Sequence, residues 1–120
     1  MANKLPATVG CPTELTLDVL SGKWKTIILA RLKSGALAYG ELRKSIPALS
    51  DKMLTERLRD LERSGLLERQ SRRADGGGRA RVIYALTARG RSLRPVLEAL
   101  FAWGLSSAPQ LGIKVRMLED

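Results

Sequence analysis

Apolar residues recur along most of the chain at the three- and four-residue spacing that is typical of an α-helix with one buried face. This spacing predicts three short helices in the first half of the chain, over about residues 12–21, 23–34 and 39–45. A glycine or a proline follows each of them, and neither residue readily continues a helix. Between the second and third helices, residues 36–38 are predicted to form a very short strand.

The clearest helical pattern lies at residues 50–64. Its apolar face is a column of three leucines, Leu54, Leu58 and Leu61. Ser50 is a good N-cap, because its hydroxyl can accept a hydrogen bond from a free backbone N–H of the first turn. The opposite face is polar and carries Lys52, Thr55, Glu56, Arg59 and Arg63. The pattern therefore predicts a capped helix with one buried and one charged side.

Two strands are predicted after this helix, over residues 67–72 and 80–86, with a turn over residues 74–78 between them. The turn holds three consecutive glycines, which adopt positive φ without steric cost and suit the tip of a hairpin. A capped helix followed by a two-stranded ribbon is the outline of a winged helix-turn-helix. We therefore predict a mostly helical α+β fold in which a small β-hairpin forms the wing.

A final long helix is predicted after Thr87, which is a suitable cap. This helix is more apolar than one face of a small domain requires, and an exposed apolar stripe usually marks a protein partner. We expect it to pair with a second copy of the chain, together with the first helix. The residues expected to pack in this dimer are Leu97, Leu100, Phe101 and Trp103.

The pattern divides the chain into three parts. Residues 1–10 are expected to be a flexible arm, residues 11–104 the folded domain, and residues 105–120 a tail without clear periodicity. A short extra helix and a disordered segment both remain open for that tail. A chain of 120 residues with 44% apolar content is long enough for one domain with a real core.

The distribution of charge along the chain says more about the partner of this protein than its overall composition does. The net charge is +9, and eight arginines between Arg69 and Arg94 are accompanied by a single acid, Asp75. Such a run suits an anionic partner, either a nucleic acid or a membrane surface, or it is a solvated face. Nucleic acid is favoured, because the arginines surround a turn and no basic amphipathic helix with an aromatic face is present.

Several other classes of protein are disfavoured. No apolar run reaches membrane-spanning length and the first ten residues lack the apolar core of a signal peptide, so we expect a cytoplasmic protein without a membrane partner. The chain has no histidine and one cysteine, which removes Cys/His zinc sites and histidine-dependent catalytic sets. We therefore expect no enzyme activity, no metal site and no cofactor.

The charged side of the 50–64 helix is the candidate for reading DNA. Lys52, Thr55 and Arg59 form a stripe near its N-terminus, and an arginine there can bond guanine O6 and N7. The alternative is a solvated face on which Glu56 pairs with neighbouring arginines. Arg63 extends the same side, and Ser50 is a cap that is also able to donate to a phosphate.

The candidate wing contacts are the arginines on both sides of the glycines, namely Arg72, Arg73, Arg79 and Arg81. Arginines on a loop suit phosphates or a narrow minor groove, whereas the alternative is charge that only keeps the hairpin soluble. Lys23 and Lys25 flank Trp24 at a helix start and are further candidates for contacts with the DNA backbone.

Cys11 precedes Pro12 at an expected helix N-terminus, where the helix dipole favours the thiolate. Our hypothesis is that this thiol senses oxidants or electrophiles. The alternative is a small buried hydrophobic residue. With one cysteine per chain, oxidation leads to an intersubunit disulfide, a sulfenic acid or a mixed disulfide.

A set of ordered motifs resembles the HxlR-type winged helix-turn-helix regulators of bacteria, within the broader MarR-like group. The motifs are Cys11-Pro12, residues 21–35, 41–43, 50–69 and 84–90, and Trp103-Gly104. The resemblance implies a homodimeric regulator that binds double-stranded DNA, with an N-terminal cysteine that responds to thiol-reactive signals in several members. The chain departs from the family at Tyr39-Gly40, where an Arg-Phe pair is common, and in its glycine-rich wing.

The predicted function is a transcriptional regulator, with a repressor favoured over an activator, that binds a pseudo-palindromic operator. A small-molecule effector or an oxidant is a possible further partner. One alternative is an architectural protein that binds nucleic acid without regard to sequence. The other is a winged helix that binds proteins and whose charges only keep it soluble.

Overall fold

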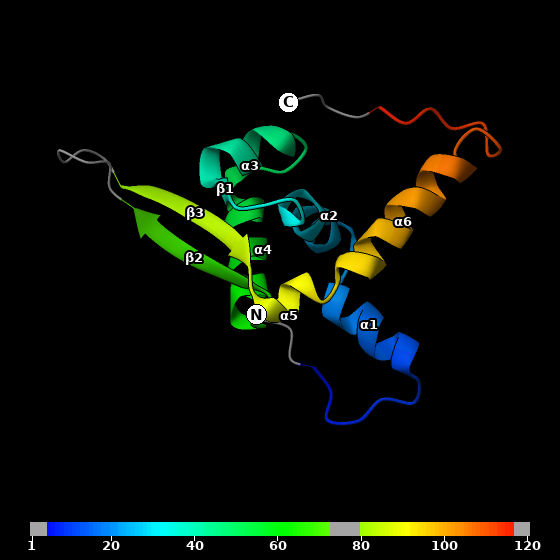
Figure 1. Cartoon of the computed structure of the whole chain (residues 1–120), viewed down its shortest axis with the longest axis horizontal. Helices are drawn as coiled ribbons and strands as arrows, with labels where there is room; N and C mark the ends of the chain where they lie inside the picture. Colours follow the sequence, from blue (N-terminus) through cyan, green and yellow to red (C-terminus); the bar gives the residue numbers. More distant parts are fainter. Residues whose placement is uncertain (1–4, 73–79, 117–120) are drawn as a thin grey trace.

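The computed structural model describes residues 5–72 and 80–116. Figure 1 shows helices packed around a small sheet, with the hairpin projecting on one side and two helices at the opposite end. The elements are α1 (Pro12–Leu20), α2 (Lys23–Leu32), β1 (Leu37–Ala38), α3 (Tyr39–Ser45), α4 (Asp51–Arg63), β2 (Leu67–Arg72), β3 (Arg81–Leu86), α5 (Ala88–Arg91) and α6 (Arg94–Ser107). This order is that of a winged helix-turn-helix, and the predicted fold class is confirmed.

The sheet is antiparallel in the order β1-β3-β2. The β2–β3 hairpin is in register from Leu67 opposite Leu86 to Arg72 opposite Arg81. The two-residue strand β1 covers the other edge of β3, with Leu37 opposite Tyr84. Strand positions follow the prediction closely, whereas the tip of the wing, with Arg73 and Arg79, lies outside the described residues.

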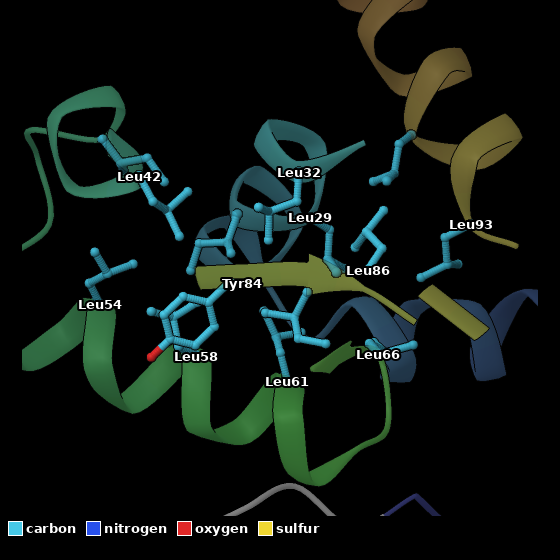
Figure 2. Packing of buried hydrophobic residues seen from close by; sticks show 14 of the residues in the cluster. Leu29, Leu32, Leu42, Leu54, Leu58, Leu61, Leu66, Tyr84, Leu86 and Leu93 are labelled. Carbon is cyan, nitrogen blue, oxygen red and sulfur yellow. The ribbon is translucent and has the colours of Figure 1, made fainter. Parts of the chain in front are cut away.

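One apolar core lies between α4, the helices α2 and α3, and the sheet (Figure 2). The three leucines of α4 are at most 1% exposed, as the column in the sequence predicted. They pack with Leu29 and Tyr84 among others. Each fully buried leucine contributes about 1.5–3 kcal/mol, so this side of α4 fixes the helix to the scaffold.

A glycine allows α5 to pack against the loop between α4 and β2. Thr87 Oγ1 donates to the Gly65 carbonyl at 2.6 Å and accepts from the Gly90 N–H at 3.1 Å. The Thr87 N–H donates to the Leu66 carbonyl at 3.0 Å. A Cβ at Gly90 would overlap that same carbonyl oxygen, so only glycine fits here.

The prediction of one long helix after Thr87 is wrong. Thr87 caps the short helix α5, and a new helix, α6, begins at Arg94 with Pro95 in its first turn. Proline has no N–H to donate, and its ring would collide with the carbonyl four residues earlier. The chain therefore ends one helix and starts another in a new direction, as Figure 1 shows.

The end of the molecule formed by α1 and α6 exposes many apolar side chains. On α6, Leu100, Phe101, Trp103 and Leu105 are 47–67% exposed, and Leu17 of α1 is 64% exposed. We call the four α6 side chains the α6 apolar surface. Helix α6 continues to Ser107, beyond the expected boundary at residue 104. None of the helices in the described ranges is long and apolar enough to cross a membrane.

Candidate nucleic-acid interface

The N-terminus of α4 is fixed by its predicted cap. Ser50 Oγ accepts a hydrogen bond from the Met53 N–H at 3.1 Å, and the Leu54 N–H donates to the Ser50 carbonyl at 2.9 Å. The side-chain bond uses a backbone donor that a helix start otherwise leaves free, and the bond from Leu54 is the first regular bond of the helix. The cap role of Ser50 is confirmed, while its role as a phosphate donor stays a prediction.

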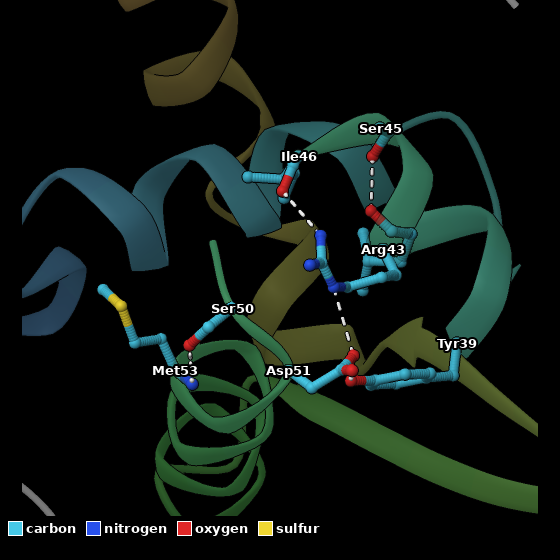
Figure 3. Close-up of polar contacts among 8 residues, drawn as sticks. Tyr39, Arg43, Ser45, Ile46, Ser50, Asp51 and Met53 are labelled. Atoms are coloured by element: carbon cyan, nitrogen blue, oxygen red, sulfur yellow. Dashed lines mark hydrogen bonds and ion pairs between the residues drawn. The ribbon is translucent and has the colours of Figure 1, made fainter. Parts of the chain in front are cut away.

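Three side chains join α3 to the first turn of α4 (Figure 3). The Tyr39 hydroxyl donates to Asp51 Oδ1 at 2.8 Å, and Arg43 Nε donates to the same oxygen at 3.1 Å. Arg43 Nη1 also donates to the Ile46 carbonyl at 3.4 Å, in the turn between the helices. We call Tyr39, Arg43 and Asp51 the Asp51 cluster. It holds the two helices of the helix-turn-helix at one relative orientation.

The cluster keeps Asp51 ionised. The hydrogen bond from Tyr39, and to a lesser degree Arg43, lowers the pKa of the Asp51 carboxyl below its usual value. Partial burial raises the pKa of Tyr39, so the phenol keeps its proton and remains a donor. The helix dipole favours an acid such as Asp51 in the first turn of a helix, but nothing in the sequence pattern points to its two partners on α3. Asp51 follows Arg43 by 8 residues and Tyr39 by 12, and no short motif indicates a contact over that separation.

The exposed side of α4 carries the predicted reading residues. We call this set the α4 face; its members are Lys52, Thr55, Glu56, Arg59 and Arg63. Thr55 is half-buried and the other four are exposed. Glu56 lies 3.9 Å from Arg57 and Arg63 lies 3.8 Å from Asp60. The Glu56 and Arg63 side chains of these pairs are 51% and 60% exposed, so each pair contributes little to stability and the two charges remain available to a ligand.

Of the two lysines expected near DNA, the structure excludes Lys25. Its Nζ lies 3.3 Å from Asp60 Oδ2, and the two side chains are 7% and 18% exposed. This pair ties α2 to α4 inside the domain, because position 25 faces α4 and not solvent. Lys23 is exposed, with its Nζ 4.6 Å from the centre of the Trp24 ring. Trp24 itself packs against the core.

The described part of the wing presents two of the four predicted arginines. Arg72 and Arg81 lie opposite each other on β2 and β3 and are both exposed. Arg72 Nη2 donates to Gln70 Oε1 at 3.0 Å, and Arg81 Nη2 lies 3.9 Å from Glu41 Oε1. The contact with Glu41 connects the start of β3 to α3, and the same Glu41 oxygen also accepts the Ala38 N–H at 2.9 Å.

Cys11 is exposed and is the N-cap residue of α1. The polar groups of Thr13, first its backbone N–H and then its side chain, lower the pKa of the Cys11 thiol, although neither makes a well-formed hydrogen bond to the sulfur. The backbone N–H of Glu14 acts in the same direction. The thiol is therefore accessible, and the direction of its pKa shift favours the thiolate, the form that reacts.

The residues predicted to pack in a dimer divide into two groups. Leu97 is 2% exposed and belongs to the core of the single chain, so its assignment to a dimer surface is wrong. Leu100, Phe101 and Trp103 are 51%, 51% and 67% exposed. A shallow apolar hollow runs beside them, lined by Pro95, Val96, Ala99, Leu100 and Trp103. The Lys33 ammonium lies 4.9 Å from the centre of the Phe101 ring, and the exposed part of the three side chains is available to a partner.

Comparison with known proteins agrees with this geometry. Residues 19–111 match the family described as HxlR-like helix-turn-helix. The chain is 42% identical over 95 residues to the HTH-type transcriptional regulator YdeP of Bacillus subtilis, covering 79% of this chain and 72% of YdeP. Among solved structures, the redox regulator HypR in its reduced form superposes with a TM-score of 0.75 at 35% identity, covering 85% of this chain and 98% of HypR. Quinone-bound YodB from B. subtilis has a TM-score of 0.62 at 33% identity, covering 80% and 99%.

Proposed function

The chain belongs to the HxlR-like helix-turn-helix family of transcriptional regulators, and we propose that it binds a pseudo-palindromic operator as a homodimer and represses transcription. The family is one of DNA-binding regulators and not of enzymes. Within the chain, we assign residues 11–104 to DNA binding and dimerisation and residues 1–10 to an N-terminal arm.

The observation that carries the proposal is the α4 face. A capped helix with a fully buried leucine side presents lysine, threonine and arginine side chains toward solvent. A helix of this kind fits the major groove, where arginine bonds guanine and threonine contacts several bases. Phosphate contacts are assigned to the wing arginines Arg72, Arg73, Arg79 and Arg81, to Ser50 and to Lys23.

The α6 apolar surface supports the homodimer. A second copy of the same surface would remove these side chains from water, and a two-fold axis makes one patch serve both chains. Two α4 helices would then enter successive major grooves about 10 bp apart. We favour repression over activation. A protein bound at a promoter is sufficient to block transcription, whereas an activator also needs a surface that contacts the polymerase.

Cys11 is proposed as the site at which thiol-reactive signals act. The exposed thiol with its lowered pKa supports this role, as does similarity to a redox regulator and to a regulator solved with a bound quinone. The thiolate would add to a ring carbon of a quinone and form a carbon–sulfur bond, and the ring would take up one proton from water to become a hydroquinone attached to the sulfur. The adduct would change how α1 and α6 pair between subunits and so release DNA.

The proposal is tested by fluorescence anisotropy of the reduced protein on its own upstream intergenic DNA and on a shuffled copy, across a salt series. We expect at least a thousandfold preference for the intergenic DNA, which is typical of specific sites. Equal binding with a steep salt dependence would instead identify an architectural protein, since phosphate contacts carry no sequence information.

The role of Cys11 is tested separately with Cys11→Ser. Benzoquinone is expected to release DNA from the wild-type protein and to leave the complex with Cys11→Ser intact. Equal release from both proteins would remove Cys11 from the mechanism while leaving DNA binding itself unaffected.

A further inference from the structure

The Asp51 cluster places a carboxylate where the proposed function directs α4 into DNA. Asp51 is the first residue of α4, its side chain is 77% exposed, and Thr55 lies one turn later on the same side. Recognition helices contact base edges with their N-terminal residues. A carboxylate at this position will therefore lie close to bases and phosphates when the helix is in the groove.

A free carboxylate in that position would be repelled by the phosphates. Here the guanidinium of Arg43, with Nε 3.1 Å from Oδ1, offsets the charge, and the Tyr39 hydroxyl fixes the orientation of the side chain. Both contacts use Oδ1. Among residues 5–72 and 80–116, none donates a hydrogen bond to Oδ2. The cluster thus holds one carboxylate oxygen in place and leaves the other as an oriented acceptor.

The chemistry of the major groove decides which base suits such an acceptor. Guanine and thymine present acceptor oxygens there, which would repel a carboxylate. Adenine has an amino group but places the acceptor N7 beside it. Cytosine presents its amino group and carries no acceptor of its own in the major groove, and aspartate accepts from that group.

We propose that Asp51 is a base-reading residue whose Oδ2 accepts a hydrogen bond from the amino group of one cytosine in each half-site. Tyr39 and Arg43 are positioning residues that orient the carboxylate. The inference rests on the proposed function, because it requires α4 in the major groove. Because the side chain is ordered before DNA arrives, little further entropy is lost on contact. The lowered pKa of Asp51 keeps it an acceptor at neutral and mildly acidic pH.

The test uses a set of operator duplexes in which each base pair of the half-site is replaced in turn by the other three. Binding of the wild-type protein, Asp51→Asn, Tyr39→Phe and Glu62→Gln is measured on every duplex. Glu62 is the matched control, because it is an exposed acid of the same helix near its far end. Circular dichroism of each free variant checks that it is folded.

We expect the wild-type protein to lose about tenfold in affinity when one particular cytosine is replaced. Asp51→Asn should lose that preference at that position alone and favour adenine there, because asparagine pairs with adenine N6 and N7. Tyr39→Phe, which keeps the ring in place, should weaken the same preference. It provides the test on its own if Asp51→Asn does not fold. Glu62→Gln should leave every preference unchanged.

Two results would overturn the inference. If Asp51→Asn lowers affinity for all duplexes by one factor and keeps the wild-type base preferences, the cluster is only structural. In that case the wild-type protein still discriminates between sequences and the proposed function stands. If the wild-type protein binds every duplex and a shuffled one alike, the proposed function fails and this inference fails with it.

Discussion

Helices α4 and α6 are of nearly equal length, 13 and 14 residues, yet they present opposite surfaces. Helix α4 buries all three of its leucines within the chain and exposes charged side chains. Helix α6 buries only Leu97 within the chain and exposes the α6 apolar surface, with Trp103 67% exposed. Figure 1 shows α6 at one end of the molecule and α4 near the middle, beside the sheet.

The difference shows how one small domain separates two kinds of recognition. The apolar side of α4 is already satisfied by the core, so what it offers is charge and hydrogen bonding, which suits a nucleic acid. The side chains of the α6 apolar surface remain 47–67% exposed, and burying them would gain roughly 25 cal/mol per Å². That gain suits a protein partner, and a second copy of the chain supplies the same surface.

The largest effect is expected from Trp103→Glu, which puts a charge into the α6 apolar surface. Since the change occurs twice in a symmetric dimer, we expect a loss of about 4 kcal/mol, close to a thousandfold in the dimer dissociation constant. Sedimentation velocity over a concentration series measures it. Glu98→Gln, an exposed change on the same helix, is the control. A dimer of unchanged strength would mean that α6 is not its interface.

The next effect concerns the buried side of α4. Lys25→Ala leaves Asp60 without its close partner, and we expect a loss of about 3 kcal/mol in the free energy of unfolding. Lys23→Ala, two residues earlier and exposed, should cost less than about 0.5 kcal/mol. Urea denaturation compares them. Equal losses would contradict the assignment of Lys25 to the interior.

A smaller effect separates the α4 face from the wing. Arg59→Ala is expected to cost about 2 kcal/mol on the operator and to relax its base preference. Arg81→Ala should weaken binding to all sequences alike and reduce the slope of log affinity against log salt by about 0.9. Anisotropy on operator and shuffled duplexes distinguishes the two. Equal effects of both variants on every sequence would remove the division between reading and anchoring residues.

The smallest effect is expected at the cap of α4. Ser50→Ala removes the bond to the Met53 N–H and should cost about 1 kcal/mol in the free energy of unfolding. Ser50→Asp, which keeps an acceptor at the same place, should restore most of that stability. Chemical denaturation of the three proteins measures the difference. A fully stable Ser50→Ala protein would show that the start of α4 is held by the Asp51 cluster alone.

Local features of the chain predicted α4 and the strands well. The leucine spacing, the Ser50 cap and the glycines that follow several elements are short-range signals, and the structure follows them. The break before α6 is also local, and Pro95 was the residue that signalled it. It was missed because the apolar period continues across it from Leu93 to Leu97.

Contacts between distant residues were not predictable in this way. Lys25 pairs with Asp60, 35 positions later, so a charge that usually points to solvent lies inside the domain. Tyr39 and Asp51 meet only because α3 and α4 pack together. The spacing of apolar residues predicts which side of a helix is buried, but it does not predict which polar side chain of another helix contacts that side. The apolar spacing also does not distinguish burial within the chain from burial against a partner, so Leu97 was assigned to the dimer although it lies in the core of the single chain.

Hydroxyl-radical footprinting by mass spectrometry tests the separation of the two surfaces most directly, because one experiment reports side-chain accessibility along the whole chain. We predict that Leu100, Phe101 and Trp103 lose reactivity as the protein is concentrated without DNA. The peptide that carries Lys52, Thr55 and Arg59 should lose reactivity only when operator DNA is added. Protection of α6 by DNA alone, with α4 unchanged, would contradict the account.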